Sequence, residues 1–227
     1  IGVSIEIVSA TRRSKEDFWE ASALGRSLKR LSQDDRLVAQ VAYANSQGLP
    51  DIYNARIAAA DRRDFLLFIH DDVWIDDSSL ADRVIDGCAA YDIIGVVGNR
   101  RRAQRQPGWA SAGIPFKWDD RSNLSGSIAH GAAPLGKVSV FGTSPADCEL
   151  LDGVFLAAKK ATLQQRAMSF DPRFDFHFYD VDFCRLARQK GLRLGTWPIR
   201  ITHQSSGGMG TPAWAETYQR YLDKWGS

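Results

Sequence analysis

One run, residues 64–73, most constrains what this chain can fold into. Within it, residues 65–69 are five apolar side chains in succession, and His70, Asp71 and Asp72 follow them directly. A continuous apolar run bounded by polar residues is typical of a strand buried on both faces of a sheet. Open α/β sheets bind ligands at the carboxyl ends of such strands, where three ionisable groups are costly unless a cation or another partner compensates them. The run therefore predicts either a divalent metal site or a polar strand end that starts a turn.

Strand and helix patterns alternate in the amino-terminal half of the chain. β-branched and apolar runs predict strands, whereas capping residues and apolar side chains at helical spacing predict helices. Their alternation indicates a doubly wound sheet that is mostly parallel in this half. The strands are expected near residues 3–10, 36–44, 64–69 and 92–98, and the helices near residues 14–31, 51–61 and 78–88.

Residues 99–135 break this pattern, because they show no convincing period and are rich in Gly, Ser and Pro. They also hold five arginines and the tryptophans Trp109 and Trp118. A loop of this length inside a compact domain is usually functional or mobile. We expect either a lid over a site, with arginines for phosphate and tryptophans for a sugar ring, or a solvated insertion.

Regular structure returns after residue 135, with many aromatic residues and carboxylates. No linker or internal repeat is visible, so the expected fold class is α/β, a single domain with a mixed sheet. We expect a strand near residues 137–141 and another near 149–158 that is interrupted at Asp152-Gly153. Residues 192–201 are expected to form a strand pair or one bent strand, and helices are expected near residues 179–190 and 214–225. The domain is expected to divide into an amino-terminal half, an insertion and a more irregular carboxyl-terminal half, at residues 1–98, 99–135 and 136–227.

Composition excludes several classes of function. Lys plus Arg (29) nearly balance Asp plus Glu (27), which argues against a general nucleic-acid surface. The three cysteines form no CxxC pair, so neither a zinc framework nor a disulfide scaffold is expected, and a reducing compartment fits best. No apolar stretch approaches the roughly 20 residues that span a bilayer. We expect a cytoplasmic protein, with peripheral contact to the inner membrane face left open.

Two carboxylates open the expected helix near residue 179. Asp180 and Asp182 are two residues apart and so do not share a helix face. One carboxylate can point into a cleft while the other serves the helix amino terminus, or both can be ordinary helix-start residues. The aromatic residues of the segment 170–182 would raise the pKa of a buried carboxyl group, as a general base requires.

His203 ends the last expected strand and precedes a loop rich in Ser and Gly. A histidine at that position can bind a metal ion or can be a hydrogen-bonded residue at a strand end.

These motifs, taken in order, resemble the GT-A glycosyltransferases, close to the family-2-like bacterial members, from about Val3 to Gly208. Residues 68–72 are similar to the Asp-x-Asp metal element of that family. This match implies that Asp72 coordinates the metal, and His70 stands where the first Asp usually is. Residues 179–182 are similar to the Glu-Asp-x-Asp element of inverting members.

The resemblance also implies roles for individual residues. Asp180 matches the catalytic base, with Tyr179 in place of the usual Glu, and His203 matches a late histidine that binds metal or diphosphate. The metal would be Mn²⁺ or Mg²⁺. The donor and acceptor pocket would hold Asp152, Gly153, Tyr179, Trp109 and Trp118. The nucleotide and donor side would hold Ser9, Ala10, Thr11, Arg12, Asn45, Asn54, His70 and Asp71.

The implied function is transfer of a sugar from a nucleoside-diphosphate sugar to an acceptor hydroxyl, by a metal-dependent, inverting hexosyltransferase of glycan or surface polysaccharide synthesis. A UDP- or GDP-sugar is favoured as donor, and the acceptor (glycan, lipid-linked or protein) is not fixed by the sequence. A homodimer is left open, and no nucleic-acid partner is expected. Two alternatives remain, a metal-dependent sugar-nucleotide hydrolase and a non-catalytic nucleotide-sugar-binding module that keeps the fold.

Overall fold

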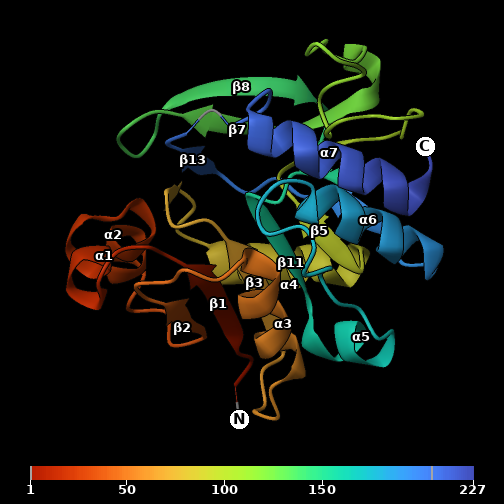
Figure 1. The fold of residues 1–227 in the computed structure, drawn as a ribbon. Coiled ribbons are helices and arrows are strands. Elements are labelled where there is room, and N and C mark those ends of the chain that lie inside the picture. Colours follow the sequence, from red (N-terminus) through yellow and green to blue (C-terminus); the bar gives the residue numbers. More distant parts are fainter. Residues whose placement is uncertain (1, 206) are drawn as a thin grey trace.

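Two mixed β-sheets form the framework of the chain (Figure 1). The structure, a computed structural model, describes residues 2–205 and 207–227. Among these residues the sheets have seven and six strands, which confirms the predicted α/β class with mixed pairing. The larger sheet runs in the order β2 (Leu37–Ala42), β1 (Ile5–Ala10), β3 (Phe65–Ile69), β11 (Phe155–Lys159), β5 (Ile93–Gly95), β12 (Leu194–Thr196) and β9 (Ala146–Cys148). The smaller sheet runs in the order β10 (Leu150–Leu151), β6 (Val97–Asn99), β7 (Leu124–His130), β13 (Ile201–His203) and β4 (Val73–Ile75), with β8 (Lys137–Gly142) paired to β7.

Helices supply the apolar side chains that bury both faces of β3. Leu66 and Phe68 belong to one apolar cluster, with side chains of α3, α6 and α7, whereas Leu67 belongs to another, with side chains of α1, α2 and α4. The predicted two-sided burial of residues 65–69 is therefore confirmed. The helices are α1 (Lys15–Ala21), α2 (Ala23–Arg30), α3 (Leu49–Ala58), α4 (Leu80–Ala90), the 3₁₀ helix η1 (Arg121–Asn123), α5 (Lys160–Gln165), α6 (Tyr179–Gln189) and α7 (Pro212–Trp225).

The pairing of β11 with β3 brings the carboxyl-terminal half of the chain to the end of the central strand. β1 pairs in parallel with β2 and β3, as predicted for the amino-terminal half. β11 pairs antiparallel with β3 and β5, and its Phe155 lies opposite Ile69. Residues 152–154 therefore lie beside His70, whose backbone N–H donates to the Val154 carbonyl at 3.3 Å.

Three predicted strand segments each form two strands that lie in different sheets. The sequence indicated the break at Asp152-Gly153 and a strand pair or bent strand over 192–201. It did not indicate the division of residues 92–98, because Val96 stays buried between β5 and β6 and keeps the apolar pattern continuous. The divided predictions are residues 92–98 (β5 and β6), 149–158 (β10 and β11) and 192–201 (β12 and β13).

The first predicted helix is also divided. Ser14 caps α1 as expected, but the Ser22 hydroxyl accepts a hydrogen bond from the Gly25 N–H at 2.9 Å and starts α2. The helix predicted from residue 51 begins two residues earlier, with Pro50 in its first turn. The sequence pattern does not predict β4, β9 or α5, which have six residues or fewer, too few for a period to show.

The absence of regular structure predicted for residues 99–135 is wrong at their carboxyl end. Leu124–His130 forms β7, which pairs with β6, β8 and β13. Its Leu-Ser-Gly-Ser sequence has weak strand propensity, but cross-strand pairing outweighs propensity. Gly126 has a φ of 89°, and a Cβ atom there would lie 1.9 Å from the Val96 carbonyl oxygen.

Among the described residues, no helix is long and apolar enough to cross a membrane.

Candidate functional site

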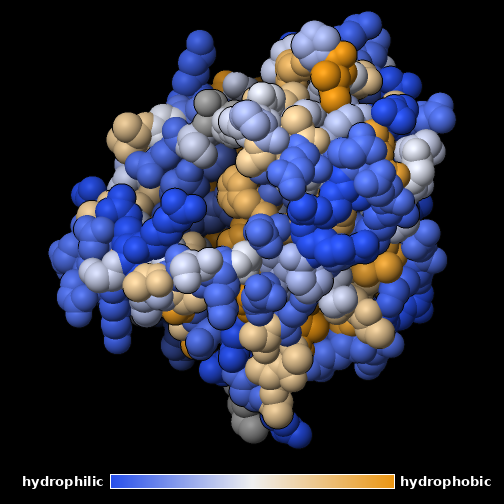
Figure 2. Space-filling model, in the orientation of Figure 1, coloured by the Kyte–Doolittle hydropathy of each residue, from blue (hydrophilic) through white to orange (hydrophobic). Residues whose placement is uncertain are grey.

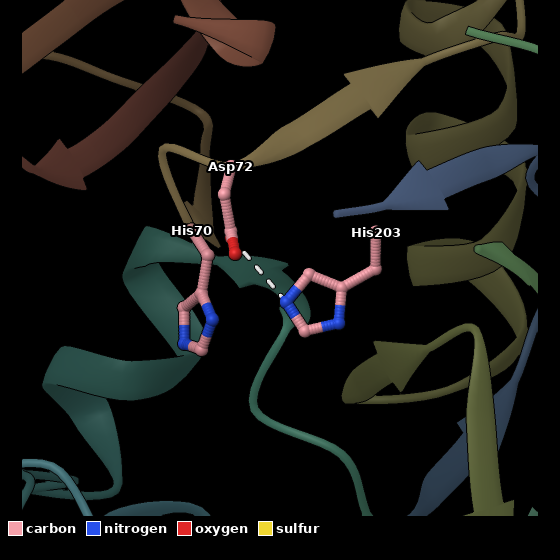
Figure 3. Close-up of side chains that lie close together, drawn as sticks. All are labelled: His70, Asp72 and His203. Carbon is pink, nitrogen blue, oxygen red and sulfur yellow. Dashed lines mark ion pairs between the residues drawn. The ribbon is translucent and has the colours of Figure 1, made fainter. Parts of the chain in front are cut away.

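The ends of β3 and β13 bring together three residues that the sequence singled out. β4 pairs antiparallel with β13, so that Val73 lies opposite His203. The loop between β3 and β4 therefore holds His70 and Asp72 next to His203 (Figure 3). The Gln204 N–H fixes this arrangement by donating to the Asp72 carbonyl at 3.1 Å.

His70, Asp72 and His203 form a candidate metal cluster. Each residue offers one ligand atom, and these atoms all lie within 4.8 Å of one another. Asp72 Oδ1 lies 3.3 Å from His203 Nε2. A set of two imidazoles and one carboxylate fits Mn²⁺ better than Mg²⁺, which prefers oxygen ligands alone. The resemblance gave Asp72 and His203 the metal role, and the structure adds His70 as a third donor.

The electrostatics of the cluster favour a negative Asp72. Burial opposes its ionisation, but the hydrogen bond and charge of His203, with smaller contributions from Ser205 and His70, lower the pKa of Asp72 to about 2. Burial likewise opposes protonation of His203, yet the hydrogen bond that His203 donates to the Asp72 carboxylate raises the pKa of His203 above its usual value. Burial lowers the pKa of His70, which keeps that imidazole neutral at neutral pH. A neutral imidazole is the form that binds metal.

Asp180 lies at the start of α6 with its carboxylate held by two backbone groups. The Gly153 N–H donates to its Oδ2 at 2.8 Å, and the Val181 N–H donates to its Oδ1 at 2.9 Å. Burial, and then the nearby charge of Asp152, raise the pKa of Asp180 to about 7 despite these hydrogen bonds. A carboxylate of this basicity can accept a proton near neutral pH.

Asp182 has a different role from Asp180. Its side chain is fully buried and pairs with the Lys224 ammonium at 2.6 Å and with the Trp225 indole N–H at 2.8 Å. Both partners belong to α7, so this carboxylate ties α6 to α7. The sequence left two alternatives open for these carboxylates. The structure supports the first in part, because Asp180 lines a cavity. Asp182, however, binds the neighbouring helix α7 and not the amino terminus of its own helix.

A cavity of about 570 Å³ lies in front of the cluster and of Asp180. Apolar residues are exposed near the centre of the face shown in Figure 2, between hydrophilic ones. The polar residues that line the 570 Å³ cavity include His70, Asp152, Tyr179, Asp180 and His203. Its apolar lining includes Trp109, Phe116, Trp118, Phe141, Met209 and Trp214. The cavity thus brings together the residues predicted for the donor and acceptor pocket, apart from Gly153, which lies just behind Tyr179 and Asp180.

The segment predicted as a lid or an insertion is attached to this cavity. The Trp109 indole N–H donates to Asp152 Oδ2 at 2.8 Å. The buried carboxylate of Asp119 accepts from the Asn99 amide at 2.9 Å and pairs with Arg101. These contacts anchor both flanks of the aromatic part of residues 99–135, which argues against a solvated insertion.

A second cavity, of about 690 Å³, shares the Phe176 side chain with the first. The Thr11 hydroxyl donates to Asp71 Oδ2 at 2.6 Å and so joins the loops that follow β1 and β3. Arg12 is exposed at this cavity. The predicted nucleotide-side residues in its lining are Ala10, Thr11, Arg12, Asn45 and Asp71.

Two predicted nucleotide-side residues lie outside the linings of both cavities. The buried Ser9 hydroxyl donates to the Ile69 carbonyl at 2.7 Å, between β1 and β3. The Asn54 amide exchanges two hydrogen bonds with the Phe170 backbone, at 2.7 and 2.8 Å. The structure therefore gives both residues a part in packing.

Sequence reasoning missed the residue that links the two cavities. Phe176 is 52% exposed and its ring lies 5.7 Å from that of His70. The aromatic run 170–179 drew attention to this segment, but the sequence could not show which of its rings is exposed at a cavity. Phe116, Phe141, Met209 and Trp214 were missed as well, because no motif includes them and only the fold brings them to one cavity.

Comparisons with known proteins place this geometry in a known fold. No protein-family model and no curated protein matches the chain. Among solved structures, the catalytic domain of Drosophila β1,4-galactosyltransferase 7 in complex with xylobiose matches with a TM-score of 0.55 at 8% identity, over 96% of this chain and 80% of that one. GalNAc-T7 with UDP, GalNAc and Mn²⁺ matches with a TM-score of 0.54 at 10% identity, over 97% of this chain and 48% of that one.

A third match is residues 1–349 of TarS from S. aureus, with a TM-score of 0.50 at 13% identity, over 97% of this chain and 64% of that one. The chain has a GT-A fold. At these identities the likeness shows the fold alone, so the expected fold is confirmed while the bacterial family-2 assignment is not tested by a family match. The GT-A fold is shared by all three neighbours, and the chain spans less than two thirds of two of them.

Proposed function

We propose that this chain transfers a hexosyl group from a nucleoside-diphosphate sugar to an acceptor hydroxyl, with inversion and with a divalent cation. The observation that supports this most strongly is the joint placement of Asp180 and of the cluster residues His70 and His203 on the wall of one cavity. Transfer needs a base and a group that stabilises the leaving diphosphate, and this cavity offers both. One GT-A neighbour was solved with UDP, GalNAc and Mn²⁺ and another with xylobiose, which agrees with this choice.

The two cavities suggest how the donor would lie. The polar second cavity, with Arg12 and Asn45, would hold the base and ribose of a UDP- or GDP-sugar. His70 and His203 line the first cavity, and Phe176, whose ring lies 5.7 Å from that of His70, lines both. The diphosphate would lie beside them. A bound Mn²⁺ would act there as a Lewis acid that neutralises the charge of the leaving diphosphate. The sugar would then enter the first cavity.

Asp180 would act as the general base. Its carboxylate is oriented by the N–H groups of Gly153 and Val181 and would take the proton of the acceptor hydroxyl as that oxygen attacks the anomeric carbon. The aromatic wall that includes Trp109 and Trp118 would stack on a sugar ring of the acceptor, which favours a glycan and a place in polysaccharide synthesis. The aromatic part of residues 99–135 would order over the bound donor as a lid.

The test is turnover with UDP-, GDP- and dTDP-sugars, Mn²⁺ and oligosaccharide acceptors. We expect Asp180→Asn to lower turnover by about 10²- to 10⁴-fold while donor affinity stays nearly unchanged. Asp86→Asn, an exposed carboxylate on α4, is the matched control and should behave like the wild type. Anomeric NMR of the product should show inversion.

Three results would contradict the proposal. If Asp180→Asn turned over close to the wild-type rate, Asp180 would not be the general base. Release of free sugar at the same rate without acceptor would identify a hydrolase. Donor binding without turnover across the whole panel would identify a non-catalytic module.

A further inference from the structure

Two residues that depart from the GT-A motifs contact each other. His70 stands where the first Asp of Asp-x-Asp is usual, and Tyr179 stands where Glu is usual in the second motif. Although they are 109 residues apart, the His70 Nε2 atom lies 2.7 Å from the Tyr179 hydroxyl oxygen. The same hydroxyl lies 2.8 Å from the Gly153 carbonyl oxygen and is buried.

Counting hydrogens assigns the direction of both hydrogen bonds. A carbonyl oxygen only accepts, and a phenol has a single hydrogen. The Tyr179 O–H therefore donates to the Gly153 carbonyl, and its oxygen presents lone pairs to His70. The His70 Nε2 atom must then carry a hydrogen, because otherwise two acceptors would face each other at 2.7 Å. In a neutral imidazole this leaves a lone pair on Nδ1.

That lone pair faces the candidate metal cluster. In Figure 3 the His70 ring nitrogen next to the side-chain stem, Nδ1, is turned toward Asp72 and His203, and Nε2 is turned away. Within the described part of the chain, no hydrogen bond of His70 Nδ1 is found, whereas Nε2 is occupied by Tyr179. Of the two ring nitrogens, Nδ1 is thus the one available to a cation.

We propose that Tyr179 is a positioning residue, which fixes His70 as the Nε2–H tautomer and makes its Nδ1 the third protein ligand of the cation. Metal-binding histidines almost always donate their other N–H to a fixed partner, and loss of that partner typically weakens metal binding about 10- to 100-fold. The proposal rests on the proposed function for the presence of the cation, whereas the tautomer follows from contacts in the protein itself.

Gly153 belongs to the same arrangement. A Cβ atom at this position would lie 2.3 Å from the Tyr179 hydroxyl oxygen and 2.6 Å from its ring. Only glycine therefore lets the Tyr179 hydroxyl reach the backbone carbonyl that takes its hydrogen. The chain of hydrogen bonds runs from Gly153 through Tyr179 to His70.

The first measurement is Mn²⁺ affinity by EPR titration in the presence of UDP. We expect Tyr179→Phe to bind Mn²⁺ about 10- to 100-fold more weakly than the wild type. Tyr53→Phe is the matched control, because Tyr53 is buried in the same aromatic cluster, with its ring 6.1 Å from Tyr179, and its hydroxyl has no partner in the described residues. Its Mn²⁺ affinity should equal that of the wild type.

A double-mutant cycle separates positioning from a general structural effect. If Tyr179 acts through His70, Tyr179→Phe should cause no further loss of Mn²⁺ affinity once His70→Ala is present. An equal loss in both backgrounds would overturn the proposal, as would an unchanged affinity of Tyr179→Phe alone.

The ¹⁵N NMR signals of the His70 side chain in the metal-free wild type give a readout that needs neither a variant nor metal. They should show a hydrogen on Nε2 and none on Nδ1, and a hydrogen on Nδ1 would overturn the proposal even if Tyr179→Phe failed to fold. If the wild type transfers sugar but binds no Mn²⁺, the ligand role of His70 fails while the transferase function stands. If it binds Mn²⁺ as expected without transferring sugar, only the proposed function fails.

Discussion

At the scale of single residues, Asp180 and Asp182 show how surroundings decide the chemistry of a carboxyl group. Asp182 is fully buried, and it is balanced by the Lys224 ammonium and the Trp225 indole. Asp180 is half-buried at the cavity wall, has only backbone N–H donors among the described residues, and lies near the charge of Asp152. The uncompensated burial of Asp180 raises its pKa into the range of a general base.

This pKa predicts the acidic side of the pH profile. A base must be deprotonated to act, so kcat/KM should rise with pH and level off above about pH 7. Asp152→Asn removes a neighbouring negative charge, which favours ionisation of Asp180 and lowers its pKa. The acidic limb of the profile, where kcat/KM rises with pH, should therefore move to lower pH. The measurement is kcat/KM against pH for both proteins. An unchanged limb in the variant would show that another group controls the profile.

At the scale of elements, the site depends on close contact between the amino end of α6 and the turn between β10 and β11. Gly153 in that turn donates to Asp180 and accepts from Tyr179, both on the first turn of α6. The carboxyl end of the chain strengthens this contact from the other side, because Trp225 on α7 binds Asp182 on α6. The base is therefore positioned by packing between elements far apart in sequence.

Gly153→Ala should disturb this contact strongly. The new Cβ atom would lie 2.7 Å from Asp180 Cβ and even closer to Tyr179, so α6 would have to move. We expect a loss of about 1–3 kcal/mol in the free energy of unfolding, the usual cost of overpacking, together with a large loss of turnover. Urea denaturation measures the first quantity.

Gly113→Ala is the control for this change, since nothing lies within 4 Å of a Cβ atom there. It should change the free energy of unfolding by less than about 0.5 kcal/mol. A Gly153→Ala protein as stable and active as this control would show that the contact has more room than the structure gives it.

At the scale of the whole molecule, two cavities share Phe176, whose ring lies beside His70 of the candidate metal cluster. His70 and His203 line the first cavity, the neighbouring residue Asp71 lines the second, and Phe176 lines both. A donor with a nucleoside at one end and a sugar at the other fits this arrangement, because the charged diphosphate would lie in the middle. The arrangement predicts that the two ends of the site can be weakened separately.

Arg12→Ala should weaken UDP binding about 10-fold or more, since a lost charge-assisted hydrogen bond costs about 1.5–3 kcal/mol. Its acceptor KM should stay unchanged. Trp118→Ala should instead raise the acceptor KM about 10-fold through lost apolar contact while UDP affinity is kept. Calorimetry with UDP and initial rates over acceptor concentration measure the two effects. If each variant changed both quantities equally, the two-cavity assignment would be wrong.

The sequence by itself determined the parts of this protein that depend on neighbouring residues. The apolar run 65–69 predicted a strand buried on both faces. The spacing of Asp180 and Asp182 placed them on different helix faces, but it left open whether either one enters a cleft. Motif order predicted the GT-A fold, which the three solved structures confirm. Such features can be read locally because side-chain periodicity and strand ends extend over only a few residues.

Only the tertiary structure decided which distant residues meet. The strand β7 forms because three neighbours pair with it, against the weak propensity of its residues. Ser9 and Asn54 turned out to hold the packing, since the surfaces that they contact come from β3 and from Phe170. His70 and Tyr179 looked like two separate departures from a motif. The pairing of β11 with β3 and the packing of α6 against the β10–β11 turn join them in one hydrogen bond. No local pattern encodes such a contact, because its geometry is set by elements far apart in the chain.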